Sequence, residues 1–245
     1  MTLSVVIPAY NEEGCIAATL QQLYRSLTEA GIEHEILVVN DNSKDATEAI
    51  LQEACRQYPT LRYITNHGPN GFGYAVRKGL SAYRGDCVAV FMADMSDDPA
   101  DLVAFYRLMI TENCDAVFGT RWSSGGCTFD YPRHKLWLNR LANHLIRIMF
   151  RTRYNDSTNA FKLYKRSTID GLQPLLSPHF NLTVELPLKT IIRGYSYRIL
   201  PNSWTNRKAG ESKLKIREMG TRYFFILLYC LIEKFFSRGD FKKKW

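Results

Sequence analysis

Acidic side chains gather in three short polar segments of the 245-residue chain, at residues 8–13, 40–43 and 94–98. Carboxylates that lie close together repel one another unless a cation or hydrogen-bond donors offset their charge. A hard divalent cation binds through one or two carboxylates together with phosphate oxygens. We therefore expect Asp94 and its neighbours to hold Mg²⁺ or Mn²⁺ on a nucleoside diphosphate, and Asp41 to accept hydrogen bonds from a base or ribose.

Some of these carboxylates also have a purely structural interpretation. Asp97 and Asp98 precede Pro99, an ordinary first residue of a helix, and either could cap that helix. Asp41 could form an Asx turn. Asp94 differs from them because it follows the apolar run 87–92, where a lone carboxylate is costly unless it binds something.

The acidic segments each follow a predicted β-strand. The predicted strands are 3–7, 35–39, 61–65, 87–92 and 116–119, and the predicted helices between them are 12–30, 45–57, 73–83 and 99–109. Parallel strands require crossover connections, so this alternation predicts an α/β fold with a mostly parallel sheet flanked by helices. Ligands bind outside the carboxyl ends of the strands in such a sheet, which is where the acidic segments fall.

Charge is distributed unevenly along the chain. Residues 1–132 carry 9 basic and 17 acidic side chains, whereas residues 133–245 carry 23 basic and 7 acidic ones. The basic half predicts an anionic partner, for which nucleic acid, a phosphorylated ligand and an acidic membrane surface are the candidates. No recognisable RNA- or DNA-binding signature is present, so we expect no nucleic-acid partner.

Several common functional motifs are missing from the sequence. The turn after the first predicted strand has no GxGxxG motif, and no GxxxxGK[ST] phosphate loop occurs, which argues against dehydrogenases and P-loop NTPases. The five histidines show no HxH or HExxH spacing, so a zinc site is not expected.

The C-terminal segment combines an apolar run with flanking basic residues. The run 223–232 has ten residues, about half of the roughly 20 that a membrane-spanning helix needs. We expect 219–236 to lie in a lipid interface with Arg222, Lys234 and 242–244 facing headgroups, and packing onto protein is the alternative. Met1 leads directly into a predicted strand without a signal peptide, which favours the cytoplasm and the cytoplasmic face of a membrane.

Six ordered sequence blocks together resemble the family 2 inverting glycosyltransferases, and more narrowly their dolichyl- or polyprenyl-phosphate mannosyltransferase branch. The blocks are PAYNE at 8–12, VNDNS at 39–43, GFGYAVRKG at 71–79, AD at 93–94, GTR at 119–121 and RKAGESK at 207–213. The resemblance covers about residues 3 to 215. It implies a GT-A (Rossmann-like) fold, a nucleotide-sugar donor (GDP-mannose favoured, UDP-sugars open), a polyprenyl phosphate acceptor and a Mg²⁺ or Mn²⁺ cofactor.

The resemblance also implies roles for residues in or near these blocks. Pro8, Ala9, Tyr10, Glu12, Asp41, Ala93 and Lys213 would bind the nucleotide-sugar; Arg121, Lys135 and Asn139 the acceptor phosphate; Asp94 and Ser96 the metal; and Asp94, Arg121 and Arg207 would be catalytic. One departure weakens the metal site, because the family usually has Asp-Ala-Asp where this chain has Met92-Ala93-Asp94. Asp97 would then compensate, or the donor phosphates would hold the cation.

A physical argument favours a phosphate acceptor. A phosphate monoester is already anionic at neutral pH and attacks without a general base, whereas a sugar hydroxyl needs one. Glu185 or Asp156 could be that base in the alternative, a family 2 enzyme that acts on a sugar hydroxyl in polysaccharide assembly. We predict a catalytic domain at 1–215 and a membrane-interface helix with a basic tail at 216–245, docked at the membrane peripherally or through an anchoring subunit.

Overall fold

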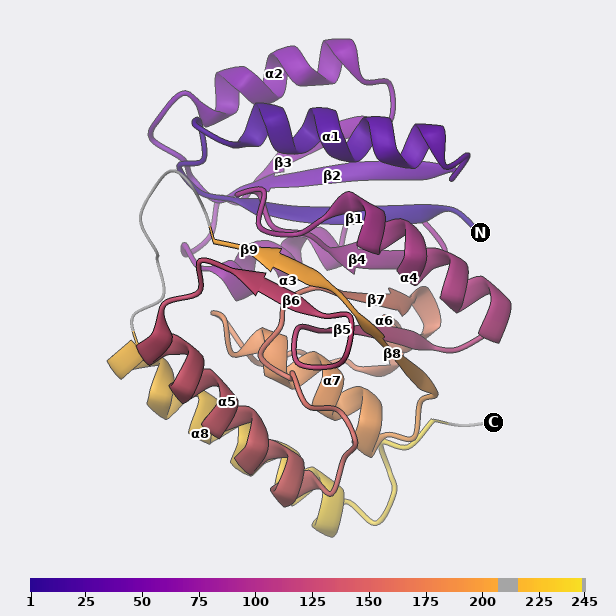
Figure 1. Cartoon of the computed structure of the whole chain (residues 1–245), viewed down its shortest axis with the longest axis vertical. Coiled ribbons are helices and arrows are strands. Elements are labelled where there is room, and N and C mark those ends of the chain that lie inside the picture. Colours follow the sequence, from indigo (N-terminus) through magenta and orange to yellow (C-terminus); the bar gives the residue numbers. More distant parts are fainter. Residues whose placement is uncertain (207–215, 244–245) are drawn as a thin grey trace.

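A seven-stranded sheet forms the centre of the computed structural model, which describes residues 1–206 and 216–243 (Figure 1). Its strand order is β3-β2-β1-β4-β7-β5-β8. The strands are β1 (Leu3–Ala9), β2 (His34–Asn40), β3 (Leu61–Thr65), β4 (Cys87–Val90), β5 (Ala116–Thr120), β7 (Lys162–Lys165) and β8 (Tyr197–Pro201), and β6 (Cys127–Phe129) pairs separately with β9 (Ser203–Thr205). The predicted α/β class is confirmed, and all five predicted strands are present.

Helices cover both faces of this sheet (Figure 1). They are α1 (Ile16–Glu29), α2 (Thr47–Gln57), α3 (Phe72–Leu80), α4 (Pro99–Glu112), α5 (Arg133–Phe150), α6 (Arg166–Gly171), α7 (Leu182–Ile192) and α8 (Ile216–Phe236). Successive residues of a strand point to opposite faces. Val5 of β1 therefore packs in the core layer of α1, α2 and α4, while Val6 packs in the layer of α3, α6 and α7.

The strand β7 is antiparallel to both of its neighbours, whereas every other pairing in the main sheet is parallel. Its first residue, Lys162, pairs with Val90 at the end of β4 and with Phe118 near the end of β5. The loop before β7 therefore lies at the edge where the parallel strands end, which we call the carboxyl edge. No strand was predicted in this part of the sequence.

The helices α5, α7 and α8 form a third core cluster beside the sheet, built on residues such as Ile146, Val184 and Ile226. One side of α8 is buried there, while Phe224 and Phe225 are 66% and 59% exposed. One side of the apolar run 223–232 thus packs onto protein, and the placement of the other side in a lipid interface stays a prediction. Within the described residues, no helix combines the length and the apolar character that crossing a bilayer requires.

Candidate active site

The ends of β1 and β2 place the first two acidic segments side by side. Ala9 pairs with Asn40, and the Asp41 backbone N–H donates to the Ala9 carbonyl at 2.8 Å. The buried Asp41 carboxylate accepts hydrogen bonds from the Asn66 amide at 2.6 Å and from the Gly71 backbone N–H at 2.7 Å. It therefore holds the loop before α3 in place.

The turn after β2 is formed by a different side chain from the one considered above. The Asn40 carboxamide oxygen accepts from the Ser43 backbone N–H at 3.0 Å. Asn40, rather than Asp41, is therefore the turn-forming residue.

The residues after β1 are held against the start of α2. The Glu12 backbone N–H donates to the Thr47 hydroxyl at 2.9 Å, and the Glu12 side chain is buried. Pro8 and Tyr10 are half-buried beside it at the end of β1. The structure thus brings Pro8, Ala9, Tyr10, Glu12 and Asp41 to one place on the carboxyl edge.

A close backbone approach explains the glycine-rich start of α3. A Cβ atom at Gly73 would lie 2.4 Å from the Ser177 carbonyl oxygen, and the Tyr74 backbone N–H donates to the Pro178 carbonyl at 3.1 Å. Only glycine allows the two backbones to come this close. This contact positions the loop that carries Gly71, a donor to Asp41.

The third acidic segment forms a tight loop after β4. Asp94 is buried and accepts from the Ser96 backbone N–H at 3.2 Å, and Asp97 accepts from the Met92 backbone N–H at 3.1 Å. Asp98 caps α4 by accepting from the Ala100 N–H at 2.8 Å. Of the two cap candidates, Asp98 is the cap, and Asp97 is left turned inward beside Asp94.

This loop offers the oxygen ligands that a hard divalent cation prefers. Burial and the adjacent Asp94 carboxylate raise the pKa of Asp97 to about 7. The buried Ser96 hydroxyl has no hydrogen-bond partner among the described residues. Two neighbouring buried carboxylates and an unsatisfied hydroxyl fit Mg²⁺ or Mn²⁺. Within residues 1–206 and 216–243, no group of three or more His, Cys, Asp or Glu side chains could hold a metal alone, so phosphate oxygens would complete the site.

Arg121, directly after β5, is locked by the loop before β7. Its Nε and Nη2 atoms donate to the two Asp156 carboxylate oxygens at 2.8 and 2.7 Å, and its backbone N–H donates to Oδ2 at 3.0 Å. Arg121 is 8% exposed and Asp156 is fully buried. Burial alone would lower the pKa of Arg121. The charge and hydrogen bonds of Asp156 more than offset this and raise the pKa above its usual value, so the guanidinium stays charged.

Polar side chains of α5 bind the same loop two residues further on. The Asn139 and Asn143 amides donate to the Thr158 hydroxyl at 2.8 and 2.9 Å. Lys135 lies one helical turn before Asn139 and therefore on the same side of α5. The loop 155–161 thus joins two of the residues expected at the acceptor phosphate, Arg121 through Asp156 and Asn139 through Thr158, and Lys135 lies on the Asn139 side of α5.

Lys162 was not identified from the sequence, yet it fixes this loop. Its buried amino group donates to the carbonyls of Ser157 and Thr183 at 3.2 Å each, and to that of Asn159. Burial lowers the pKa of Lys162 to about 7. A lysine at the start of a short strand gives no sequence signal for such a role.

Two predicted site residues, Arg207 and Lys213, lie outside the described residues. The strand before them can be placed, because the Thr205 backbone N–H donates to the Ser96 carbonyl at 3.0 Å. Glu185, a candidate base, is fully buried, 2.7 Å from Lys189, and accepts from the backbone N–H groups of 176 and 177. It lies on α7, and its partners are on α7 and in the segment before that helix.

Comparison with known proteins shows the family of this chain. The model of the family described as Glycosyl transferase family 2 matches residues 4–172, which is more than half of the chain. The chain belongs to glycosyl transferase family 2. Its match begins in β1 and ends after β7, so it contains all three acidic segments and the loop that holds Arg121.

Two relatives are each 28% identical to this family 2 chain. One is the dolichol-phosphate mannosyltransferase of Pyrococcus furiosus, over 221 residues that cover 88% of this chain and 60% of that protein. The other is the polyprenol monophosphomannose synthase of Mycolicibacterium smegmatis, over 218 residues that cover 86% of this chain and 80% of that protein. The chain thus spans less than two thirds of the length of the first relative.

Solved structures of glucosyl-3-phosphoglycerate synthase from Mycobacterium tuberculosis share the fold. The complex with Mn²⁺, UDP-glucose and phosphoglyceric acid has a TM-score of 0.71 at 17% identity, and the complex with Mn²⁺, UDP and glucosyl-3-phosphoglycerate has 0.70 at 18%. Each match covers 95% of this chain and 79% of the other chain. This likeness shows that the sheet and its helices form the GT-A fold.

Proposed function

We propose that the protein transfers mannose, with inversion, from GDP-mannose to a polyprenyl phosphate such as dolichyl or undecaprenyl phosphate. The names of the two relatives support both the sugar and the acceptor class. The acidic loops after β1, β2 and β4 support a nucleotide-sugar donor. A UDP-sugar remains a donor to be tested beside GDP-mannose.

The two sides of α5 carry the argument for a lipid acceptor. One side holds Asn139 and Asn143 against the loop that binds Arg121. The other exposes a row of large apolar side chains: Trp137 (76%), Leu138 (51%), Leu141 (46%), Leu145 (50%) and Ile148 (60%). A phosphate held on the polar side would thus be next to a surface suited to an isoprenoid chain and its membrane.

The carboxylates suggested as general bases are committed to other partners. Asp156 is held by Arg121, and Glu185 is paired with Lys189 on α7. Removing either from its pair would leave a buried charge uncompensated. An acceptor that needs no base, which a phosphate monoester is, suits this arrangement better than a sugar hydroxyl.

We assign roles to the site residues accordingly. Asp94, Asp97 and the Ser96 hydroxyl would hold Mg²⁺ or Mn²⁺, which when bound offsets the charge of the departing diphosphate. Arg121 would orient the acceptor phosphate with Lys135 and Asn139. For Arg207 and Lys213, the sequence resemblance alone supports contact with the donor diphosphate.

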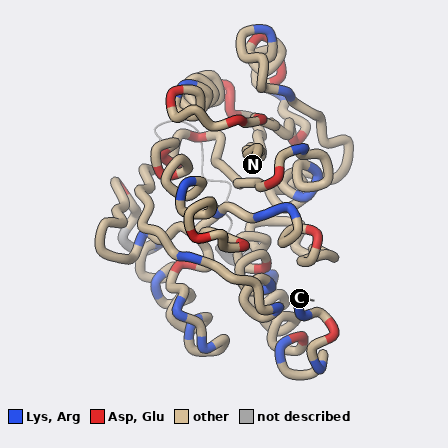
Figure 2. Tube along the Cα trace, turned by 90° about the vertical axis from the view of Figure 1, so that its right-hand side faces the viewer, with Lys and Arg blue, Asp and Glu red and all other residues tan. Residues whose placement is uncertain are grey.

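We also propose that α5 and α8 rest on the cytoplasmic surface of a membrane. The two helices share the third core cluster, Lys234 of α8 donates to the Phe150 carbonyl at the end of α5, and both helices expose apolar side chains. Lys and Arg recur along these lower helices (Figure 2), and they would meet anionic headgroups. Direct docking through this surface accounts for the exposed side chains without an anchoring subunit.

The direct test is product formation. The purified chain is incubated with radiolabelled GDP-mannose, UDP-glucose or a UDP-N-acetylhexosamine, a short polyprenyl phosphate, and either Mn²⁺ or EDTA. We expect acid-labile mannosyl lipid from GDP-mannose only, and only with Mn²⁺. Asp94→Asn should lower turnover by at least about a hundredfold, whereas Asp98→Asn, which keeps a capping side chain in the same loop, should not. Transfer to a sugar hydroxyl with none to lipid phosphate would overturn the proposal.

A further inference from the structure

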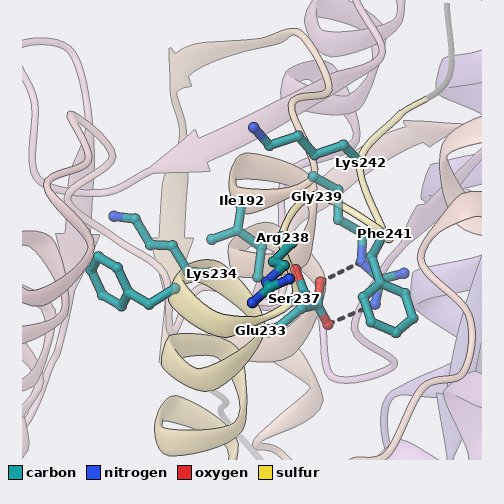
Figure 3. A pocket seen from close by; sticks show the side chains of 10 residues that line it. Ile192, Glu233, Lys234, Ser237, Arg238, Gly239, Phe241 and Lys242 are labelled. Atoms are coloured by element: carbon teal, nitrogen blue, oxygen red, sulfur yellow. Dashed lines mark hydrogen bonds and ion pairs between the residues drawn. The ribbon is translucent and has the colours of Figure 1, made fainter.

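A pocket of about 180 Å³ lies at the C-terminal end of α8, among side chains of α7, α8 and the turn that follows (Figure 3). Four of its lining residues, Arg193, Lys234, Arg238 and Lys242, are basic. One water occupies about 30 Å³ in the liquid. The pocket therefore has room for a phosphate group with several hydrating waters.

The acidic side chain that lines this pocket is already neutralised. Both Glu233 carboxylate oxygens accept from Arg193, at 2.7 and 2.8 Å, and this pair is buried. Asp240, in the turn after α8, is exposed and does not line the pocket. The three remaining cations therefore give the pocket a positive charge that its own carboxylate does not offset.

Structural duties account for only part of this positive charge. Lys234 donates to the Phe150 carbonyl at 2.7 Å, which caps the end of α5. Burial and the nearby Arg151 lower the pKa of Lys234, as expected where like charges gather. The side chains of Arg238 and Lys242 make no hydrogen bond or ion pair with any described residue, and both are exposed. The Lys242 side chain packs beside Gly239, 3.5 Å from the position of a Cβ there.

The pocket adjoins the apolar surface that α5 and α8 expose. Phe235 lines the pocket and is 65% exposed, and the next residue, Phe236, is 77% exposed. A positively charged pocket at the border of an exposed apolar surface suits an amphiphile with an anionic head and apolar tails.

We propose that this pocket binds the phosphate of an acidic phospholipid headgroup, with Arg238 and Lys242 as the main contacts and Lys234 as the third. This site rests on the membrane docking proposed above for α5 and α8 and names the lipid that it would bind. It takes no part in sugar transfer. Bound lipid would fix the end of α8 that is remote from the carboxyl edge.

Vesicle co-sedimentation tests the site without measuring turnover. The full chain is mixed with neutral phosphatidylcholine vesicles or with vesicles that also contain phosphatidate. The test variant is Arg238→Gln/Lys242→Gln. The control is Arg25→Gln/Arg107→Gln, which removes the same charge from exposed positions on α1 and α4. Thermal unfolding of all three proteins confirms that they fold.

A basic side chain at an anionic surface contributes about a fivefold change in partitioning. We therefore expect the test variant to bind phosphatidate vesicles about 25-fold more weakly, the control to change by less than about twofold, and binding to neutral vesicles to be equal in all three. Equal losses in test and control variants would overturn the site. If none of the three proteins bound neutral vesicles, the proposed docking surface on α5 and α8 would be contradicted instead.

A second arm separates lipid from free phosphate. Inorganic phosphate at millimolar concentration is added to the wild-type protein and the test variant, and thermal unfolding is followed. We expect little stabilisation of either protein and no displacement from phosphatidate vesicles. If phosphate stabilises only the wild type while phosphatidate does not enhance vesicle binding, the pocket holds a soluble anion and the lipid assignment is wrong.

Discussion

Replacing Asp97 by Asn should stabilise the metal-free protein at pH 8. The pKa of Asp97 rises from 3.8 to about 7 because the carboxyl group is buried and Asp94 is close. A group whose pKa is raised by folding adds stability that is fully present below about pH 4 and lost as the pH rises through about 7. A shift of about three units corresponds to at most about 4 kcal/mol. Asparagine removes this penalty and still accepts the hydrogen bond from Met92.

The assay is urea unfolding in EDTA at pH 5, 6, 7 and 8. Asp97→Asn should gain a few kcal/mol at pH 8 and progressively less toward pH 5, as the pH approaches the unfolded-state pKa of 3.8. Asp98→Asn, whose side chain is exposed, should show no such pH dependence. Adding Mn²⁺ at pH 8 should stabilise the wild type more than Asp97→Asn. A gain in stability that is the same at pH 5 and pH 8 would refute the raised pKa of Asp97 and its explanation by burial and the Asp94 charge.

Three further substitutions test the remaining parts of the site. Asp156→Ala should lower the free energy of unfolding by about 3–5 kcal/mol, because Arg121 is left buried and unpaired; an unchanged denaturation midpoint would contradict this. Glu185→Gln should lower the melting temperature but keep kcat per folded molecule within about twofold, whereas loss of a general base would cost 10²–10⁴-fold. Gly73→Ala should cost about 1–3 kcal/mol in a thermal or urea assay, because the new Cβ lies 2.4 Å from a backbone oxygen; unaltered stability would mean that the loop yields freely.

The first half of the fold could be predicted because its strands are continuous apolar runs. Neither β7 nor β8 was predicted, since Lys162–Lys165 begins and ends with lysine and Tyr197–Pro201 contains an arginine and ends with proline. Helix α7 was also missed, and it buries Glu185 and Lys189 as an ion pair that resembles surface charge in the sequence. Charges paired within the core give no local pattern.

The candidate site divides in the same way. Asp41 and Asp94 were predicted at the carboxyl edge because each directly follows a strand, and position after a strand is a local property. The bond between Arg121 and Asp156 joins residues 35 positions apart through an antiparallel strand that was not foreseen. Asp156 was therefore considered as a base, although it positions an arginine.

The strand β7 lies between β4 and β5 and thus separates two groups of loops at the carboxyl edge. The loops proposed to bind the donor follow β1, β2 and β4, while Arg121, proposed to orient the acceptor, follows β5 on the far side of β7. Mutations on the β5 side of β7 would change acceptor choice without disturbing nucleotide recognition. We expect this fold to diversify by replacement of the whole segment from β5 through α5, while the strands and loops before it stay unchanged.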